Sequence, residues 1–261
     1  MCVATAIKPS HEAEPGPRND SATGPWYGDN ARELMTYVHD SHPTCVYAWE
    51  FGKCVARVVA HDDHARLTYR ARSEPNLWFF TYGLIISATQ MVDDFKTMKS
   101  LMVSINPQWL LIGNDCAFQI PLVGEFLPVF TDWMKDGGGQ LVDIITWHWY
   151  PLEGPDCPLE GFPVAASPTR VITPTTLAMD IPYRDQVLQY TAKYARNDTK
   201  VWLGEMAAAS CGGMTNVTDA WAGAFYYLDK LGMLSEQGHD AVLRQSLYSS
   251  KYGACGSRRG C

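Results

Sequence analysis

The stretch KVWLGEMAAASCGGMTNVTDAWAGAFYYLDKLG, residues 200–232, contains the unit that decides the fold class. Its first seven residues, KVWLGEM, have the apolar character of a buried β-strand. From Thr218 or Asp219, the two candidate N-caps, the sequence predicts a helix that runs to Gly238. Three apolar residues share one face of this helix: Trp221, Phe225 and Leu228. A strand followed by an amphipathic helix is the repeating unit of an α/β protein.

The same alternation extends over most of the chain. Apolar, β-rich runs predict five strands, at residues 44–52, 108–115, 141–150, 200–206 and 239–248. Helical periodicity predicts helices at residues 29–41, 89–104, 121–139, 181–198 and 218–238. A proline-rich loop is expected at residues 151–174.

Strands that are apolar throughout and alternate with helices indicate parallel pairing with both faces covered, as in a barrel or a doubly wound sheet. A complete (β/α)8 barrel needs eight strands. We therefore predict an α/β fold, a partial (β/α)8 TIM barrel with about the last five βα units. The expected organisation is a disordered lead-in at residues 1–24, the barrel at 25–250 with an irregular insertion at 53–73, and a tail at 251–261.

Composition narrows the classes of function. The net charge of −7, with acids and bases interspersed, argues against nucleic-acid binding. No apolar run is long enough to span a membrane, and the first residues lack the pattern of a signal peptide. The eight cysteines show neither C-x-x-C nor zinc-type spacing, so no metal site is expected. Sequons at Asn19, Asn197 and Asn216 suit a secreted glycoprotein.

Candidate catalytic residues stand at the ends of predicted strands, where parallel barrels build their sites. Glu205 ends one strand, and His148 and Tyr150 end another. Glu74 would follow a third strand closely if residues 53–73 were absent. Two carboxylates facing one pocket, with aromatic and imidazole neighbours, are the components of a glycosidase.

The motifs WEFG with EPNLW, DIITWHWYPLEG, and residues 200–232 followed by AVLRQ resemble heparanase and its relatives in glycoside hydrolase family 79, over residues 25–250. That family has a (β/α)8 barrel with an appended β-sandwich and cleaves β-glucuronides with retention of configuration. The resemblance implies Glu205 as nucleophile and Glu74 as acid/base. It also implies Tyr150 as a hydrogen-bond partner of the nucleophile. Trp149 departs from the family, which would have a histidine at this position.

Further implications of the resemblance concern the substrate. It implies that the N–H groups of Gly212 and Gly213 bind the uronate carboxylate and that His148 lines the donor subsite. Read from the residues alone, the two glycines could serve only as a turn, with no role in substrate binding. The aromatic and imidazole residues could likewise belong to the core. No cofactor is expected. The implied partner is a uronic-acid-containing polysaccharide or proteoglycan, at a secreted, lysosomal or extracellular location that allows peripheral membrane or matrix association.

Two other functions remain open on the sequence. One is a catalytically inactive relative that binds a glycan or a protein partner. The other is a different barrel glycosidase with two glutamates, such as an arabinofuranosidase.

Residues 53–73 stand where the family has a single Asn, and we predict that they are a retained intron. Splice sites fit possible codons of Lys53-Cys54-Val55 and of Ser73, and splicing would join them into one Asn codon. A genuine surface loop is the alternative. The early barrel strands and the β-sandwich are also expected to be missing from this chain, as in a fragmentary gene.

Overall fold

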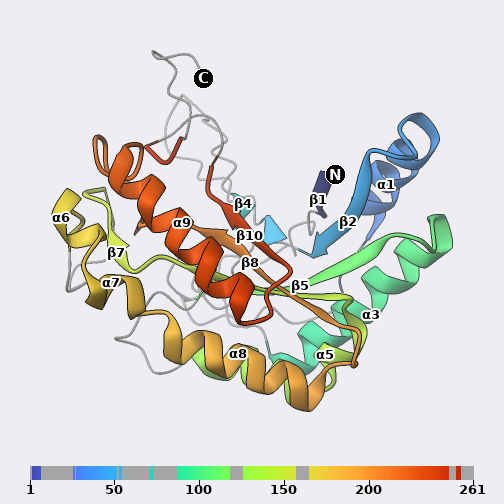
Figure 1. Cartoon of the computed structure of the whole chain (residues 1–261). Coiled ribbons are helices and arrows are strands. Elements are labelled where there is room, and N and C mark those ends of the chain that lie inside the picture. Colours follow the sequence, from blue (N-terminus) through green and yellow to red (C-terminus); the bar gives the residue numbers. More distant parts are fainter. Residues whose placement is uncertain are drawn as a thin grey trace, which may run out of the picture. The chain divides into compact units, whose positions relative to one another are not determined.

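The computed structural model describes residues 2–6, 26, 28–51, 53–54, 71–72, 87–117, 126–156, 165–246 and 251–253. The chain, coloured along its sequence in Figure 1, divides into two compact units. The first comprises Met1–Cys116, Glu125–Ile145 and Thr191–Thr199, and the second comprises Ala117–Gly124, Thr146–Tyr190 and Lys200–Cys261.

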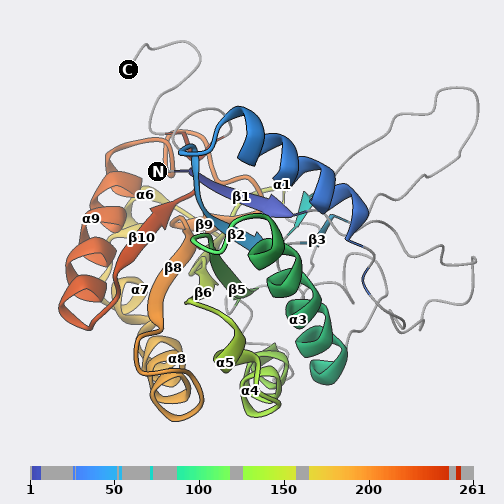
Figure 2. The same cartoon turned by 90° about the vertical axis from the view of Figure 1, so that its right-hand side faces the viewer.

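The first unit contains parallel strands in the order β1 (Cys2–Ala6), β2 (Val46–Phe51) and β5 (Leu110–Ala117). Its helices are α1 (Asp29–Ser41), α3 (Ala88–Ile105), α4 (Phe126–Lys135) and α5 (Gly138–Leu141). Helix α3 contacts α1, α4 and α5, and Figure 2 shows α1 and α3 near β1 and β2. Edge-to-face aromatic contacts fill the core between these elements, including Phe51 with Phe95 at 4.9 Å between ring centroids.

Helix α3 illustrates how the sequence sets an element. The Ser87 hydroxyl accepts a hydrogen bond from the Gln90 N–H and caps the first turn. Apolar residues at helical spacing then face the core, among them Met91, Phe95 and Met98. The helix ends at Ile105, two residues before a proline.

The second unit contains strands in the order β6 (Ile144–Trp149, from Thr146 onward), β8 (Lys200–Met206) and β10 (Ala241–Arg244). A small parallel pair joins β7 (Leu152–Glu153) to β9 (Ala209–Ser210). The helices are α6 (Pro168–Val171), α7 (Pro174–Ala178), α8 (Ile181–Tyr194) and α9 (Trp221–Glu236). Helix α9 lies against β10, as both views show (Figures 1 and 2).

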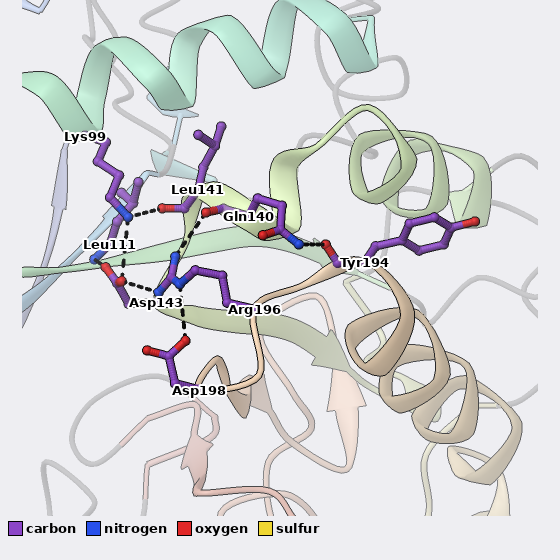
Figure 3. A network of polar contacts seen from close by, with 8 residues as sticks. All are labelled: Lys99, Leu111, Gln140, Leu141, Asp143, Tyr194, Arg196 and Asp198. Carbon is purple, nitrogen blue, oxygen red and sulfur yellow. Dashed lines mark hydrogen bonds and ion pairs between the residues drawn. The ribbon is translucent and has the colours of Figure 1, made fainter.

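A polar network in the first unit fixes the amino-terminal ends of β5 and β6 (Figure 3). The Asp143 carboxylate accepts the Leu111 N–H at 2.9 Å and pairs with Arg196 at 2.6 Å and Lys99 at 3.6 Å. Arg196 also donates to the Gln140 carbonyl at 3.0 Å. In parallel barrels this end of the strands serves stability, whereas the carboxyl ends carry chemistry.

All five predicted strands and all five predicted helical segments are present, although the segment at 121–139 contains two helices, α4 and α5. The disordered lead-in is wrong for Cys2–Ala6, which form β1 and pair with β2. The proline-rich loop contains β7 and α6. The irregular insertion begins and ends in regular structure, because β3 (Lys53–Cys54) pairs antiparallel with β4 (Ala71–Arg72).

Helix α9 differs from its prediction in two respects. Its N-cap is Ala220, with no side-chain hydrogen bond, so neither Thr218 nor Asp219 caps it. The predicted apolar face is exposed, with Trp221 78% accessible. The helix instead buries the opposite face, which carries Tyr226 and Lys230, and the Lys230 ammonium is paired there with the buried Asp180 carboxylate.

Candidate active site

Glu205 lies one residue before the end of β8, at a β-bulge. In the pairing of β8 with β10, Leu203 stands opposite Val242 and Met206 stands opposite Arg244. β8 therefore has one more residue than β10 over this interval, and the extra residue falls at Gly204–Glu205. Bulges near strand ends redirect side chains, and here the Glu205 side chain keeps 28% of its surface exposed.

Two residues from the end of β6 contact the Glu205 carboxylate. The Tyr150 hydroxyl donates a hydrogen bond to Oε1, and His148 Nδ1 lies 3.6 Å from Oε2. Both side chains are buried in a strand end that is apolar on its other positions. The structure thus brings together three of the residues that the sequence selected, each at the carboxyl end of a strand.

Gly212 and Gly213 form a turn that requires glycine. Both have left-handed backbone, with φ of 89° and 78°, and a Cβ on Gly213 would stand 2.5 Å from Thr218 Oγ1. The Gly212 N–H donates to the Tyr252 hydroxyl at 2.8 Å, and the Gly213 N–H donates to the Ser210 carbonyl at 3.0 Å. Both N–H groups therefore have acceptors within the protein.

Tyr252 is a site residue that the sequence analysis did not select. The sequence predicts a tail at 251–261, but Lys251 pairs with Gly213 and Tyr252 is buried against Tyr150 and Ala207. The Tyr150 and Tyr252 ring centroids are 6.0 Å apart. One tyrosine in a stretch of serine, lysine and glycine gives no periodic signal, so the sequence offered no means of finding it.

The loops after β6 and β8 are held together by β7 and β9. Glu153 pairs with Ser210, and the Ser210 hydroxyl donates to the Leu152 carbonyl at 3.3 Å. Gly154 allows the approach, since a Cβ there would lie 2.6 Å from the Gly213 carbonyl. Burial raises the pKa of the Glu153 carboxyl. Cys211, beside the glycine turn, is disulfide-bonded.

Two other predictions concern residues 74 and 149. Glu74, the predicted acid/base, lies outside the described residues. Trp149 is buried and packs on Tyr183, with ring centroids 5.0 Å apart, as wall packing rather than as an exposed platform.

The sequence model "Glycosyl hydrolase family 79, N-terminal domain" matches residues 82–232, more than half of the chain. The chain belongs to glycosyl hydrolase family 79. It is 26% identical over 226 residues to "Heparanase" of Bos taurus, across 86% of this chain and 35% of that protein. It is 27% identical over 191 residues to "Inactive heparanase-2" of Homo sapiens, across 71% of this chain and 29% of that protein. This family member thus spans about a third of the length of these curated relatives.

Solved structures support the fold. A 4-O-α-L-rhamnosyl-β-D-glucuronidase from Fusarium oxysporum matches with a TM-score of 0.58 and 14% identity, over 87% of this chain and 43% of that one. The predicted partial (β/α)8 barrel of this family 79 chain is confirmed. Among its described residues, no helix is both long and apolar enough to cross a membrane.

Proposed function

We propose that this family 79 chain is a retaining glycoside hydrolase that cleaves β-glucuronide linkages in uronic-acid-containing glycans, of heparan-sulfate or arabinogalactan type. The observation that carries the proposal is the Glu205 carboxylate, placed by a bulge at the end of β8 and bonded by the Tyr150 hydroxyl. A partly exposed carboxylate with a fixed orientation suits a nucleophile, because attack requires one defined geometry.

In the proposed mechanism Glu205 attacks the anomeric carbon and forms a glycosyl-enzyme intermediate. The Tyr150 hydroxyl orients Oε1, and His148 borders the other carboxylate oxygen in the donor subsite. Glu74 is the proposed acid/base, which protonates the leaving oxygen and then activates water. Retention by this route requires the two carboxyl groups to stand about 5 to 5.5 Å apart.

The proposed uronate subsite is the Gly212–Gly213 turn. The Gly212 N–H now donates to the Tyr252 hydroxyl, and the Gly213 N–H donates to the Ser210 carbonyl. A substrate carboxylate that binds at the turn would replace these two acceptors. Tyr252 adds a hydroxyl that can donate to a carboxylate oxygen once the Gly212 N–H is taken by the substrate.

The partner and compartment follow from the same proposal. We expect a uronic-acid-containing polysaccharide or proteoglycan as partner, with a secreted, lysosomal or matrix-associated location. The sequon residues Asn197 and Asn216 are exposed, as glycan attachment in a secreted protein requires.

A second candidate is a catalytically inactive member of the family that binds glycans or a partner. It is favoured by the similarity to a relative named inactive, at 27% identity over 191 residues against 26% over 226 residues for heparanase. The first candidate predicts glycan binding with turnover, whereas the second predicts binding of a glycan or a partner without turnover.

The test is hydrolysis of a chromogenic β-glucuronide by the full chain, with β-glucoside and α-arabinofuranoside as comparison substrates. Glu205→Gln should lower kcat by about 1,000-fold or more, and Glu236→Gln, at the exposed end of α9, should leave kcat unchanged. Proton NMR of the first product should show the β-anomer. Glycan binding without turnover would refute the proposed enzyme and support the inactive binding protein. Preference for the arabinofuranoside would indicate the other class of glycosidase.

A further inference from the structure

Arg244 lies beside the catalytic end of β8 but contacts none of the reacting groups. It is the last residue of β10, and its Cα pairs with that of Met206, the residue that follows Glu205. The carboxyl ends of neighbouring barrel strands face the same site, and this is the end at which barrel enzymes place functional residues.

The guanidinium of Arg244 is held by backbone carbonyls. Nη2 donates to the Thr218 carbonyl at 2.9 Å and to the Tyr252 carbonyl at 3.0 Å, and Nη1 lies 3.5 Å from the Gly223 carbonyl. The cation also stands 6.0 Å from the centre of the Tyr227 ring. Within the part of the chain that the structure describes, no carboxylate forms an ion pair with it.

The Arg244 side chain is half-buried, and carbonyl dipoles take the place of a counter-ion and of part of its water, which is a costly environment for a cation. Burial accordingly lowers the pKa of the Arg244 guanidinium, and the nearby Tyr227 opposes this change. Nε is buried and makes no hydrogen bond to the described residues. A neutral side chain could fill the space at lower cost, so the charge needs an explanation other than packing.

The two carbonyls nearest to Arg244 belong to the two sides of the glycine turn. Thr218 closes the turn, because its hydroxyl accepts the Met214 N–H at 2.8 Å and donates to the Lys251 carbonyl at 2.5 Å. Tyr252 stands on the other side, where its hydroxyl accepts the Gly212 N–H. Arg244 therefore joins the segment that carries the turn to the segment that carries the tyrosine.

We propose that Arg244 is a positioning and specificity-determining residue, which fixes Gly212 and Tyr252 relative to each other and supplies the positive charge that favours a carboxylate-bearing sugar. The inference rests on the proposed function, because it assigns the acid-binding end of the same site. The positioning effect reaches the nucleophile through Tyr252. The Tyr252 ring packs on Tyr150, whose hydroxyl donates a hydrogen bond to the Glu205 carboxylate. Lysine cannot reproduce the arrangement, because only the planar guanidinium group of arginine can donate to three carbonyls at once.

The experiment compares Arg244→Gln and Arg244→Lys with Arg196→Gln in the full chain. Arg196 is the matched control because it also makes several side-chain bonds, to Gln140, Asp143 and Asp198, in the other unit. Activity is measured as kcat/KM on 4-nitrophenyl β-glucuronide and on the corresponding β-glucoside. Arg244→Gln should lower the ratio of the two values about tenfold, mainly through KM for the glucuronide, with a smaller fall for Arg244→Lys. Arg196→Gln should lower the thermal midpoint and leave the ratio unchanged.

Binding gives a readout that does not need turnover. Isothermal titration with free glucuronic acid and with glucose should show about tenfold weaker glucuronic acid binding in Arg244→Gln and no change in Arg196→Gln. A wild-type chain that binds glucuronic acid without hydrolysis would refute the proposed enzyme and still test Arg244. The proposal is overturned if wild-type protein does not prefer the acid, or if Arg244→Gln loses thermal stability with an unchanged acid-to-neutral ratio.

Discussion

His239 predicts a loss of stability in mild acid. Its Nε2 accepts a hydrogen bond from Trp147 Nε1 at 3.1 Å, so this nitrogen cannot carry a proton in the folded state. The imidazole is buried, and burial together with the nearby Arg184 charge lowers its pKa from 6.5 to about 4, against an opposing effect of Asp240. Protonation would break the bond to Trp147 and place a charge beside β6.

The magnitude follows from the two pKa values. The folded pKa lies below the unfolded pKa, so the contribution of His239 to stability is complete above pH 6.5 and is lost as the pH falls toward 4. The difference, 6.5 minus about 4, is about 2.5, and each pKa unit corresponds to about 1.4 kcal/mol. The largest loss is therefore about 3 kcal/mol, and linkage gives about 2 kcal/mol by pH 5.

Urea unfolding of wild type and His239→Gln between pH 7.5 and pH 4 measures this contribution. Glutamine keeps an acceptor for Trp147 but does not titrate, so subtraction of the two curves removes the effect of all other groups. The stability advantage of wild type over the variant should shrink by about 2 kcal/mol between pH 7.5 and pH 5. His42→Gln serves as the control at an exposed histidine. Parallel curves for wild type and His239→Gln would refute the reasoning.

Three further substitutions test one buried ion pair and two glycines. Lys230→Met should lower the free energy of unfolding by about 3–5 kcal/mol, because it leaves the buried Asp180 carboxylate without its partner at 2.6 Å. In urea titrations, the double variant Lys230→Met with Asp180→Leu should recover most of the lost free energy. Equal losses in the single and the double variant would contradict this explanation. Gly213→Ala should cost about 1–3 kcal/mol, because its φ of 78° is left-handed and Thr218 blocks a Cβ. Gly232→Ala, inside α9 with open space around its Cβ, should instead stabilise by about 1 kcal/mol in thermal unfolding, so a loss there would show that α9 is under other constraints.

Periodicity was sufficient to predict five strands and the helices between them. The five strands are short runs rich in apolar residues, and residues 144–149 are buried at every position because both faces of a parallel sheet are covered. Strand β1 was missed because its five residues precede a long segment rich in proline, glycine and charge. The buried side of α9 was also missed, since a helix that is apolar on two faces does not reveal which face meets the core.

The candidate site was predictable only where a motif or a strand end marked a residue. Glu205, His148 and Tyr150 are such residues, and the structure places them in contact. The roles of Gly212 and Gly213 as carboxylate ligands stay a prediction, because both N–H groups have protein acceptors in this structure.

Five strands, the helices between them and the end of the sheet at which chemistry can occur are predictable from the sequence, because they depend on local periodicity and on the direction of parallel strands. The surroundings of the glycine turn, in contrast, depend on contacts between residues far apart in the sequence. Tyr252 lies 40 residues from Gly212, and Arg244 reaches Thr218 across 26 residues. Such contacts depend on the register of β10 against β8 and on the bulge at Glu205, which no local pattern encodes.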